Sequence, residues 1–140
     1  MKSSRSISDL HPIVADLCHK FITECKAQGI TILITCTYRD YATQNALYAQ
    51  GRTKPGRKVT NARGGYSYHN FHVAFDFVPI VNGKAQWHDD HTFTHCGEIG
   101  EKLGLEWAGR WIKFKETAHM QLTQGHNLAY FRAGGTLTSP

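Results

Sequence analysis

The sequence has 140 residues, of which 41% are hydrophobic and 19% are charged, a composition typical of one globular domain with a hydrophobic core. No apolar run approaches the roughly 18 residues of a membrane span, and the first residues contain no apolar stretch of the kind that a secretory signal needs. The net charge of +5 favours an anionic partner, which could be nucleic acid, anionic lipid or a cell-wall polymer.

The first third of the chain is predicted to contain two helices with a strand between them. Apolar residues recur at helical spacing over residues 8–26, with Ser8 as the N-cap and Gly29 after the end. Residues 30–36 are rich in β-branched side chains, which predicts a buried strand. Residues 41–50 are predicted to form the second helix.

Residues 51–66 form a glycine-rich and basic segment that predicts a long loop. Loops of this length inside a compact domain are uncommon and often functional. Its positive charge is typical of a solvated loop, and it could equally attract a polyanion. The basic residues of this region, which contains no acidic residue, are Arg52, Lys54, Arg57, Lys58 and Arg63.

The remaining chain predicts short strands around one more helix. The strand-like run 72–80 precedes an Asn-Gly pair, a strong turn signal. Residues 89–103 are predicted to be helical, and 104–109 and 118–122 are predicted to be short strands. The Gly- and Thr-rich segment 123–140 is expected to be a flexible tail. We therefore expect a single domain over 1–140, with its core at about 8–122.

The four cysteines do not form a recognisable metal or disulfide pattern. Cys18, Cys25, Cys36 and Cys96 include no CxxC pair, so neither a zinc knuckle nor a dense disulfide framework is indicated. We expect all four to be reduced and mostly buried.

Residues 64–77, "GGYSYHNFHVAFDF", place ionisable side chains within a short apolar run. His69, His72 and Asp76 would be costly to bury together without a partner. His69 and Asp76 are seven residues apart and would face opposite sides of one regular strand. If both point at one centre, His69 must precede the strand, Asp76 must lie within it, and a bend must separate them.

A second pair of residues downstream completes a candidate zinc site. Glu116 lies three residues before His119, so we expect Glu116 at the end of a loop and His119 on the strand that follows. Two imidazoles and one carboxylate are a common catalytic zinc set, and a nearby carboxylate that is not a ligand can accept a proton from water. The alternative is that these side chains never meet, because nine histidines make chance spacings easy. Residue chemistry alone leaves both interpretations open.

Several motifs resemble those of a known peptidase family. Residues 67–76 resemble the "SxHxxGxAxD" signature of zinc peptidases related to VanY-type D,D-carboxypeptidases and VanX-type dipeptidases. Together with "TYRD", "GLEWAGRW" and "FKETAHMQ", in that order, the chain is similar over residues 8–122 to the L-alanyl-D-glutamate endopeptidase branch, which includes phage endolysins. The resemblance implies an α+β fold of the Hedgehog and D-Ala-D-Ala-peptidase type, with a small antiparallel sheet flanked by helices.

The resemblance also implies roles for individual residues. It implies that His69, Asp76 and His119 bind zinc. It makes Glu116 the general base and Arg39 the group that polarises the scissile carbonyl and stabilises the oxyanion, as a fixed guanidinium can.

The roles of three polar residues can each be interpreted in more than one way. Arg39 could instead be an exposed residue that pairs with Asp40 or Glu116. Ser67 could hydrogen-bond a ligand or orient the histidine two positions later. Gln44 could contact substrate or brace its helix.

His72 departs from the family pattern, which has glycine at this position. A glycine there would serve the expected bend, where a positive φ costs it little. We expect the His72 side chain to point to solvent. Two other possibilities are contact with substrate in the cleft and an extra metal ligand that would block catalysis.

The resemblance implies a zinc-dependent endopeptidase that hydrolyses the L-Ala–D-Glu bond of the peptidoglycan stem peptide. We expect a monomer that neither binds nucleic acid nor inserts into a membrane. The alternatives are a D,D-carboxypeptidase or dipeptidase acting on D-Ala termini, and a catalytically inactive wall-binding module. The missing signal sequence and the likeness to phage lysins lead us to expect a bacteriolytic phage or prophage protein. It would be made in the cytoplasm and reach the cell wall through holin-mediated release.

Overall fold

The computed structural model describes residues 1–139, and its first elements largely match the predicted ones. The main helix begins later than expected, because Pro12 occupies its first position and the ring of His11 accepts a hydrogen bond from the backbone N–H of Ile13. Proline suits this position because the first N–H groups of a helix have no partner within it. The prediction of Ser8 as the N-cap was therefore wrong. The elements in this part are the 3-10 helix η1 (Ile7–Asp9), α1 (Pro12–Ala27), β1 (Thr31–Cys36) and α2 (Tyr41–Ala49).

The later elements are short and follow the predicted order. Asn82 and Gly83 have φ values of 52° and 76°, which confirms a tight turn between two paired strands. No helix within residues 1–139 combines the length and the apolar character needed to cross a membrane. The elements are η2 (Tyr68–Phe71), β2 (Ala74–Val81), β3 (Lys84–Ala85), α3 (Asp90–Lys102), β4 (Glu106–Trp107), η3 (Ala108–Arg110), β5 (His119–Gln121) and α4 (Leu128–Arg132).

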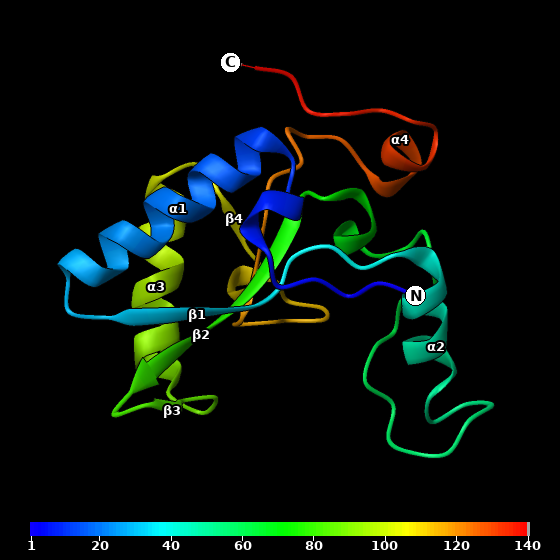
Figure 1. Cartoon of the computed structure of the whole chain (residues 1–140), viewed down its shortest axis with the longest axis horizontal. Helices are drawn as coiled ribbons and strands as arrows, with labels where there is room; N and C mark the ends of the chain where they lie inside the picture. The colour runs from blue at the N-terminus through cyan, green and yellow to red at the C-terminus, as the bar shows by residue number, and fades with distance from the viewer. Residues whose placement is uncertain (140) are drawn as a thin grey trace.

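The strands form one antiparallel sheet in the order β1-β2-β5-β4, with β3 paired to β2. Strand β2 is central and pairs with strands from both earlier and later parts of the chain. In Figure 1, α1 and α3 lie over one end of the molecule, and α2 with the loop after it lies at the other. The expected α+β fold, a small antiparallel sheet flanked by helices, is confirmed.

Aromatic packing decides which face of β2 is turned toward the helices. The ring of Phe77 lies 5.0 Å from that of Phe21 on α1 and 5.5 Å from that of Phe93 on α3. Because successive side chains of a strand point to opposite faces, Asp76 projects from the face that these helices do not cover. The sheet therefore has an aromatic core on one side and room for a polar site on the other.

The C-terminal segment is not a flexible tail, and that prediction was wrong. It contains α4, and the side chains of Phe131 and Leu137 are only 4% exposed. The ring of Phe131 lies 6.0 Å from Tyr68 and 5.9 Å from Phe71. These few apolar residues fix the segment against η2, although Gly and Thr dominate its composition.

The four cysteines are buried and none forms a disulfide, as predicted. Burial raises the pKa of the Cys18 thiol to about 12, so this thiol stays protonated and behaves as a small apolar side chain.

Candidate active site

The sheet register brings three side chains with metal-binding groups into one row. Cys36 on β1 pairs with Asp76 on β2, and Asp76 pairs with His119 on β5. An irregularity in β1 between Ile34 and Cys36 sets this alignment. Because directly paired residues project from the same face of a sheet, the three side chains lie side by side.

His69 reaches this row from η2, just before β2. The hydroxyl of Ser67 caps η2 by accepting a hydrogen bond from the His69 N–H at 3.3 Å. At the other end His72 has φ 64° and ψ 21°, and this left-handed residue turns the chain into the strand. The expected bend between His69 and Asp76 is present.

Both predicted histidine ligands contact the same oxygen atom of Asp76. The Oδ1 atom of Asp76 lies 3.1 Å from Nε2 of His69 and 3.0 Å from Nδ1 of His119. Around a tetrahedral zinc ion with bonds of about 2.0–2.1 Å, two donors would lie about 3.3 Å apart. The distance from Asp76 to each imidazole nitrogen is therefore close to the spacing of two donors around an ion of that size.

The outer hydrogen bonds of both imidazoles fix which nitrogen faces the centre. Nδ1 of His69 lies 3.1 Å from the carbonyl oxygen of Thr37, which can only accept, so this nitrogen carries the proton. Nε2 of His69 is then left with a lone pair directed at Asp76. Without a cation between them, that lone pair and the carboxylate would repel each other.

His119 is oriented in the same way through two further side chains. Its Nε2 lies 2.9 Å from Oε1 of Gln121, whose amide N–H donates to the carboxylate of Glu106 at 3.4 Å. The Glu106 carboxylate thus fixes the amide orientation, and Gln121 fixes the tautomer that leaves Nδ1 of His119 free. Sequence reasoning missed Gln121 and Glu106, because only the pairing of β4 with β5 brings them together.

The electrostatics of the cluster favour a positive charge at its centre. Burial lowers the pKa of His69, but the charge and hydrogen bond of Asp76 outweigh it and raise the value to about 10. Burial acts to raise the pKa of Asp76, yet the two imidazoles hold it well below its usual range. A proton or a metal ion at this centre satisfies both groups.

Cys36 is a second neighbour of the site that sequence reasoning missed. The thiol sulfur of Cys36 and donor atoms of His69 and Asp76 all lie within 4.8 Å of one another. Residues 30–36 predicted a buried strand, but its register against β2 could not be predicted from the sequence. The thiol borders the centre on the side of Arg39, whose Nη2 lies 3.4 Å from the sulfur.

Arg39 is held beside the site by Gln44 and makes no ion pair. Its Nη1 donates to Oε1 of Gln44 at 2.9 Å, and no carboxylate in the described chain lies within 4.0 Å of its guanidinium. Gln44 is fully buried and donates its amide N–H to the carbonyl of Ala62 at 2.7 Å. Gln44 therefore braces Arg39 and the 51–66 loop, and it does not line the cavity described below.

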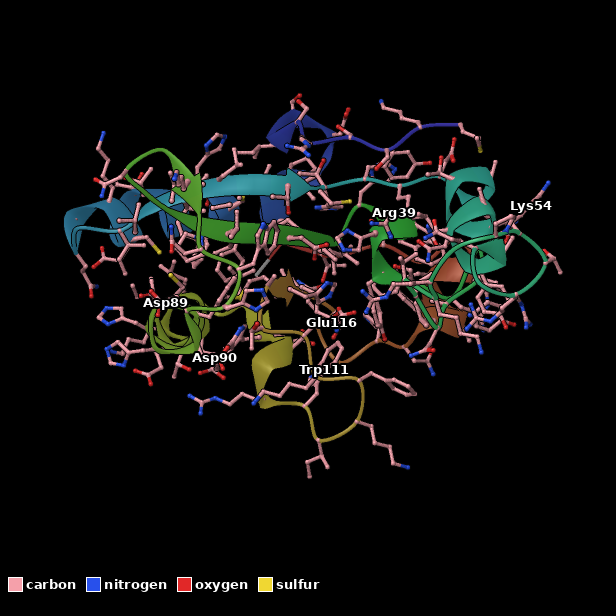
Figure 2. All side chains as sticks on the ribbon, turned by 90° about the horizontal axis from the view of Figure 1, so that it is seen from below. Arg39, Lys54, Asp89, Asp90, Trp111 and Glu116 are labelled. Atoms are coloured by element: carbon pink, nitrogen blue, oxygen red, sulfur yellow. The ribbon has the colours of Figure 1, made fainter. Side chains whose placement is uncertain are left out.

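One cavity of about 520 Å³ connects the metal-binding groups with the predicted catalytic residues. Its walls include Ser67, the loop residues 59–62 and the aromatic residue Trp111. Figure 2 shows Arg39, Glu116 and Trp111 near the middle of the molecule, whereas Lys54 lies at the outer edge of the loop. The Glu116 side chain is 60% exposed, and its Oε2 lies 3.7 Å from Nδ1 of His119.

His72 contributes to neither the cavity nor the metal-binding cluster. Its half-buried ring stacks on Tyr38, and its Nδ1 hydrogen-bonds the carbonyl of Asp9. The expectation that His72 points to solvent was wrong, and its ring lies outside both the cavity lining and the group of metal-binding donors.

Comparison with known proteins decides the family. A family model described as VanY, D-alanyl-D-alanine carboxypeptidase, matches residues 7–123. The chain belongs to the VanY family. The chain is also 39% identical over 124 residues to the peptidoglycan L-alanyl-D-glutamate endopeptidase CwlK of Bacillus subtilis, with 82% of this chain and 74% of CwlK covered.

Two solved structures share the VanY-family fold at low sequence identity. The L-Ala D-Glu endopeptidase ChiX of Serratia marcescens superimposes with a TM-score of 0.65 at 18% identity, over 96% of this chain and 93% of ChiX. The D,D-pentapeptidase VanY from a VanB-type resistance cassette, an E175A mutant in complex with Zn(II), superimposes with a TM-score of 0.62 at 11% identity. The match covers 87% of this chain and 78% of that VanY chain. Both support the fold, and the ChiX match includes most of the C-terminal segment.

Proposed function

We propose that this protein is a zinc-dependent peptidase that hydrolyses the L-alanyl–D-glutamate bond of peptidoglycan stem peptides. The observation that supports zinc-dependent hydrolysis is that His69 and His119 both contact Asp76 in a cavity that Glu116 and Arg39 also line. The choice of bond rests on the 39% identity to CwlK, a peptidoglycan L-alanyl-D-glutamate endopeptidase.

His69, Asp76 and His119 would hold the zinc ion through the donor atoms described above. A bound zinc ion supplies Lewis acidity, which lowers the pKa of a water molecule and polarises a carbonyl group. Hydrogen bonds to the carbonyl of Thr37 and to Oε1 of Gln121 fix the orientation of both imidazoles, so that the other ring nitrogen faces the metal position.

Glu116 is placed to move the proton of the attacking water. Its carboxylate lies at the cavity wall, beside His119 and outside the group of three donors. It accepts the proton as the water attacks and then delivers it to the leaving amine, so one group acts as general base and general acid.

Arg39 is placed to stabilise the negative charge that develops on the carbonyl oxygen. Gln44 and Cys36 hold its guanidinium in one orientation, and its buried Nε has no hydrogen-bond partner among residues 1–139. A donor fixed before the reaction needs no reorganisation as charge develops.

The test is mass spectrometry of the fragments released from purified peptidoglycan, with and without a chelator. We expect new L-alanine carboxyl ends and D-glutamate amino ends, lost on chelation and restored by zinc. The family description favours one other candidate, a D-alanyl-D-alanine carboxypeptidase. Loss of terminal D-alanine would establish that candidate, and no release from folded, zinc-loaded protein would indicate an inactive wall-binding module.

We further propose a bacteriolytic role as a phage or prophage endolysin, on the resemblance to phage lysins alone. The net charge of +5 would favour approach to an anionic wall, and added salt should weaken that attraction. Expression in the bacterial cytoplasm should cause lysis only when a holin is co-expressed. Lysis without the holin would contradict the proposed release route.

A further inference from the structure

Cys36 lies next to the proposed zinc position, on the opposite side of Asp76 from His119. Asp76 on β2 pairs with Cys36 on β1 and with His119 on β5. The thiol sulfur of Cys36 and donor atoms of His69 and Asp76 all lie within 4.8 Å of one another. Among residues 1–139, His119 does not belong to this group. We call Cys36, His69 and Asp76 the thiol set, which shares two of its three side chains with the proposed zinc ligands.

The thiol of Cys36 has polar neighbours, whereas the other cysteines lie among apolar ones. Nη2 of Arg39 donates to its sulfur at 3.4 Å, and the imidazole of His69 is also within hydrogen-bonding distance of the thiol. The hydrophobic core contains the other three cysteines, which are Cys18, Cys25 and Cys96. Of the four cysteines in the described chain, Cys36 is therefore the one whose sulfur lies beside other metal-binding groups.

A cation can reach the thiol set through the active-site cavity. His69 and Asp76 line this cavity, and the buried thiol of Cys36 lies next to both. Nδ1 of His69 bonds the carbonyl of Thr37, so Nε2 is the nitrogen left to bind a cation. The same Nε2 faces the proposed zinc position. A cation held by the thiol set therefore prevents zinc from using its own ligands.

The donor atoms of the thiol set favour a soft cation that is larger than zinc. Thiolate sulfur is a soft ligand, whereas imidazole and carboxylate ligands alone suit zinc well. Around tetrahedral zinc with bonds of about 2.0–2.3 Å, a sulfur and a nitrogen donor would lie about 3.6 Å apart. The thiol set spans up to 4.8 Å, which leaves room for longer bonds. Cd²⁺ forms longer bonds than zinc and prefers sulfur, and the thiol binds it as a thiolate whose proton leaves to solvent.

We propose that Cys36, His69 and Asp76 form a second cation position, which binds thiophilic divalent cations such as Cd²⁺ and excludes zinc from the position beside His119. The binding stands on the geometry of the thiol set. Its consequence, inhibition of peptide hydrolysis by Cd²⁺, rests on the proposed function.

The experiment is a titration of the metal-free protein with Cd²⁺, followed by the ultraviolet charge-transfer absorption of a cadmium–thiolate bond. The wild type should show this band, and it should saturate at one Cd²⁺ per chain. Cys36→Ala should lose the band, and its affinity for Cd²⁺ should fall by at least about 100-fold, more than the loss of an outer hydrogen bond to a ligand causes. Cys18→Ala is the matched control, because it removes a sulfur from the hydrophobic core, and it should keep the band.

His119→Ala distinguishes a second position from a fourth ligand at the zinc position. His119 does not belong to the thiol set, so this variant should keep the cadmium–thiolate band. Loss of the band in His119→Ala would mean that Cys36 only adds to the zinc ligands, and the second position would be rejected. Absence of the band in the wild type, or its persistence in Cys36→Ala, would also reject the proposal.

Thermal unfolding of the metal-free variants checks that the fold is retained. If Cys36→Ala does not fold, Cys36→Ser takes its place, because a hydroxyl still accepts a hydrogen bond from Arg39 and is a poor ligand for Cd²⁺.

Hydrolysis of a stem peptide by the zinc-loaded protein tests the consequence separately. Cd²⁺ should inhibit the wild type, and excess zinc should restore its activity. In Cys36→Ser, the Cd²⁺ concentration that halves the variant's own cadmium-free rate should rise at least about tenfold, which corresponds to about 1.4 kcal/mol. Equal sensitivity of both proteins would contradict inhibition through the thiol set. If the L-Ala–D-Glu bond is not cleaved even without Cd²⁺, the proposed function fails, and the absorption titration still decides whether the second position exists.

Discussion

The imidazole of His72 lies flat on the ring of Tyr38, with the centroids 3.9 Å apart and the planes 5° from parallel. Tyr38 precedes Arg39, and its carbonyl accepts a hydrogen bond from the N–H of Ser4 at 2.7 Å. The Nδ1 atom of the same His72 ring hydrogen-bonds the carbonyl oxygen of Asp9. The stacked pair therefore ties the N-terminal segment to the two chain segments that carry Arg39 and His69.

We expect His72→Ala to destabilise the protein by about 2 kcal/mol and His72→Gly by about 1 kcal/mol, measured by denaturant unfolding. Both variants lose the stack and one hydrogen bond. Glycine adopts the left-handed conformation of position 72 without strain, whereas alanine keeps a strain of roughly 1 kcal/mol there. Zinc stoichiometry should stay the same in both. A loss of zinc in His72→Gly would show that His72 reaches the metal.

Glu116→Gln should lower kcat by about 10²–10⁴-fold, the usual contribution of a general base, while zinc remains bound. The metal should stay because this side chain is largely exposed and lies outside the three converging donors. Metal analysis and turnover of a stem peptide are measured on the same sample. Glu98→Gln, at an exposed position of α3, is the control and should have normal activity. Unchanged turnover in Glu116→Gln would remove Glu116 from the reaction.

Gln121→Leu should weaken zinc affinity about 10–100-fold, because His119 loses the partner that fixes its tautomer. Competition with a chromogenic chelator gives the affinity. Glu106→Gln keeps an acceptor for the Gln121 amide and should change the affinity much less. If Gln121→Leu binds zinc as tightly as the wild type, the hydrogen bond does not orient His119.

Phe131→Ala should lower the free energy of unfolding by about 3 kcal/mol, the usual cost of emptying a buried aromatic site. Phe131 is buried against Tyr68 and Phe71, on either side of His69. Phe114→Ala, which removes a largely exposed ring, should cost less than about 0.5 kcal/mol. Equal effects of the two substitutions would mean that α4 is only loosely held.

Helices and strands were predictable from the sequence where a local pattern decides them. Helical spacing placed α1 and α3 within a few residues, and the Asn82-Gly83 pair fixed the turn after β2. Ser8 failed as an N-cap because Pro12 can begin a helix without a backbone donor. The prediction of a flexible C-terminal tail failed because it rested on the Gly- and Thr-rich composition. The burial of Phe131 and Leu137 depends on contacts with the rest of the fold.

The sequence by itself determined which residues could form the site, because His69, Asp76, Glu116 and His119 carry motif spacings that follow from chemistry and resemblance. Only the tertiary structure decided how they meet. The register of β1, β2 and β5 sets Cys36 and His119 on either side of Asp76, and packing of α4 brings Arg132 to Tyr66. Strand register and helix packing depend on contacts between distant segments, which no local pattern of residues encodes.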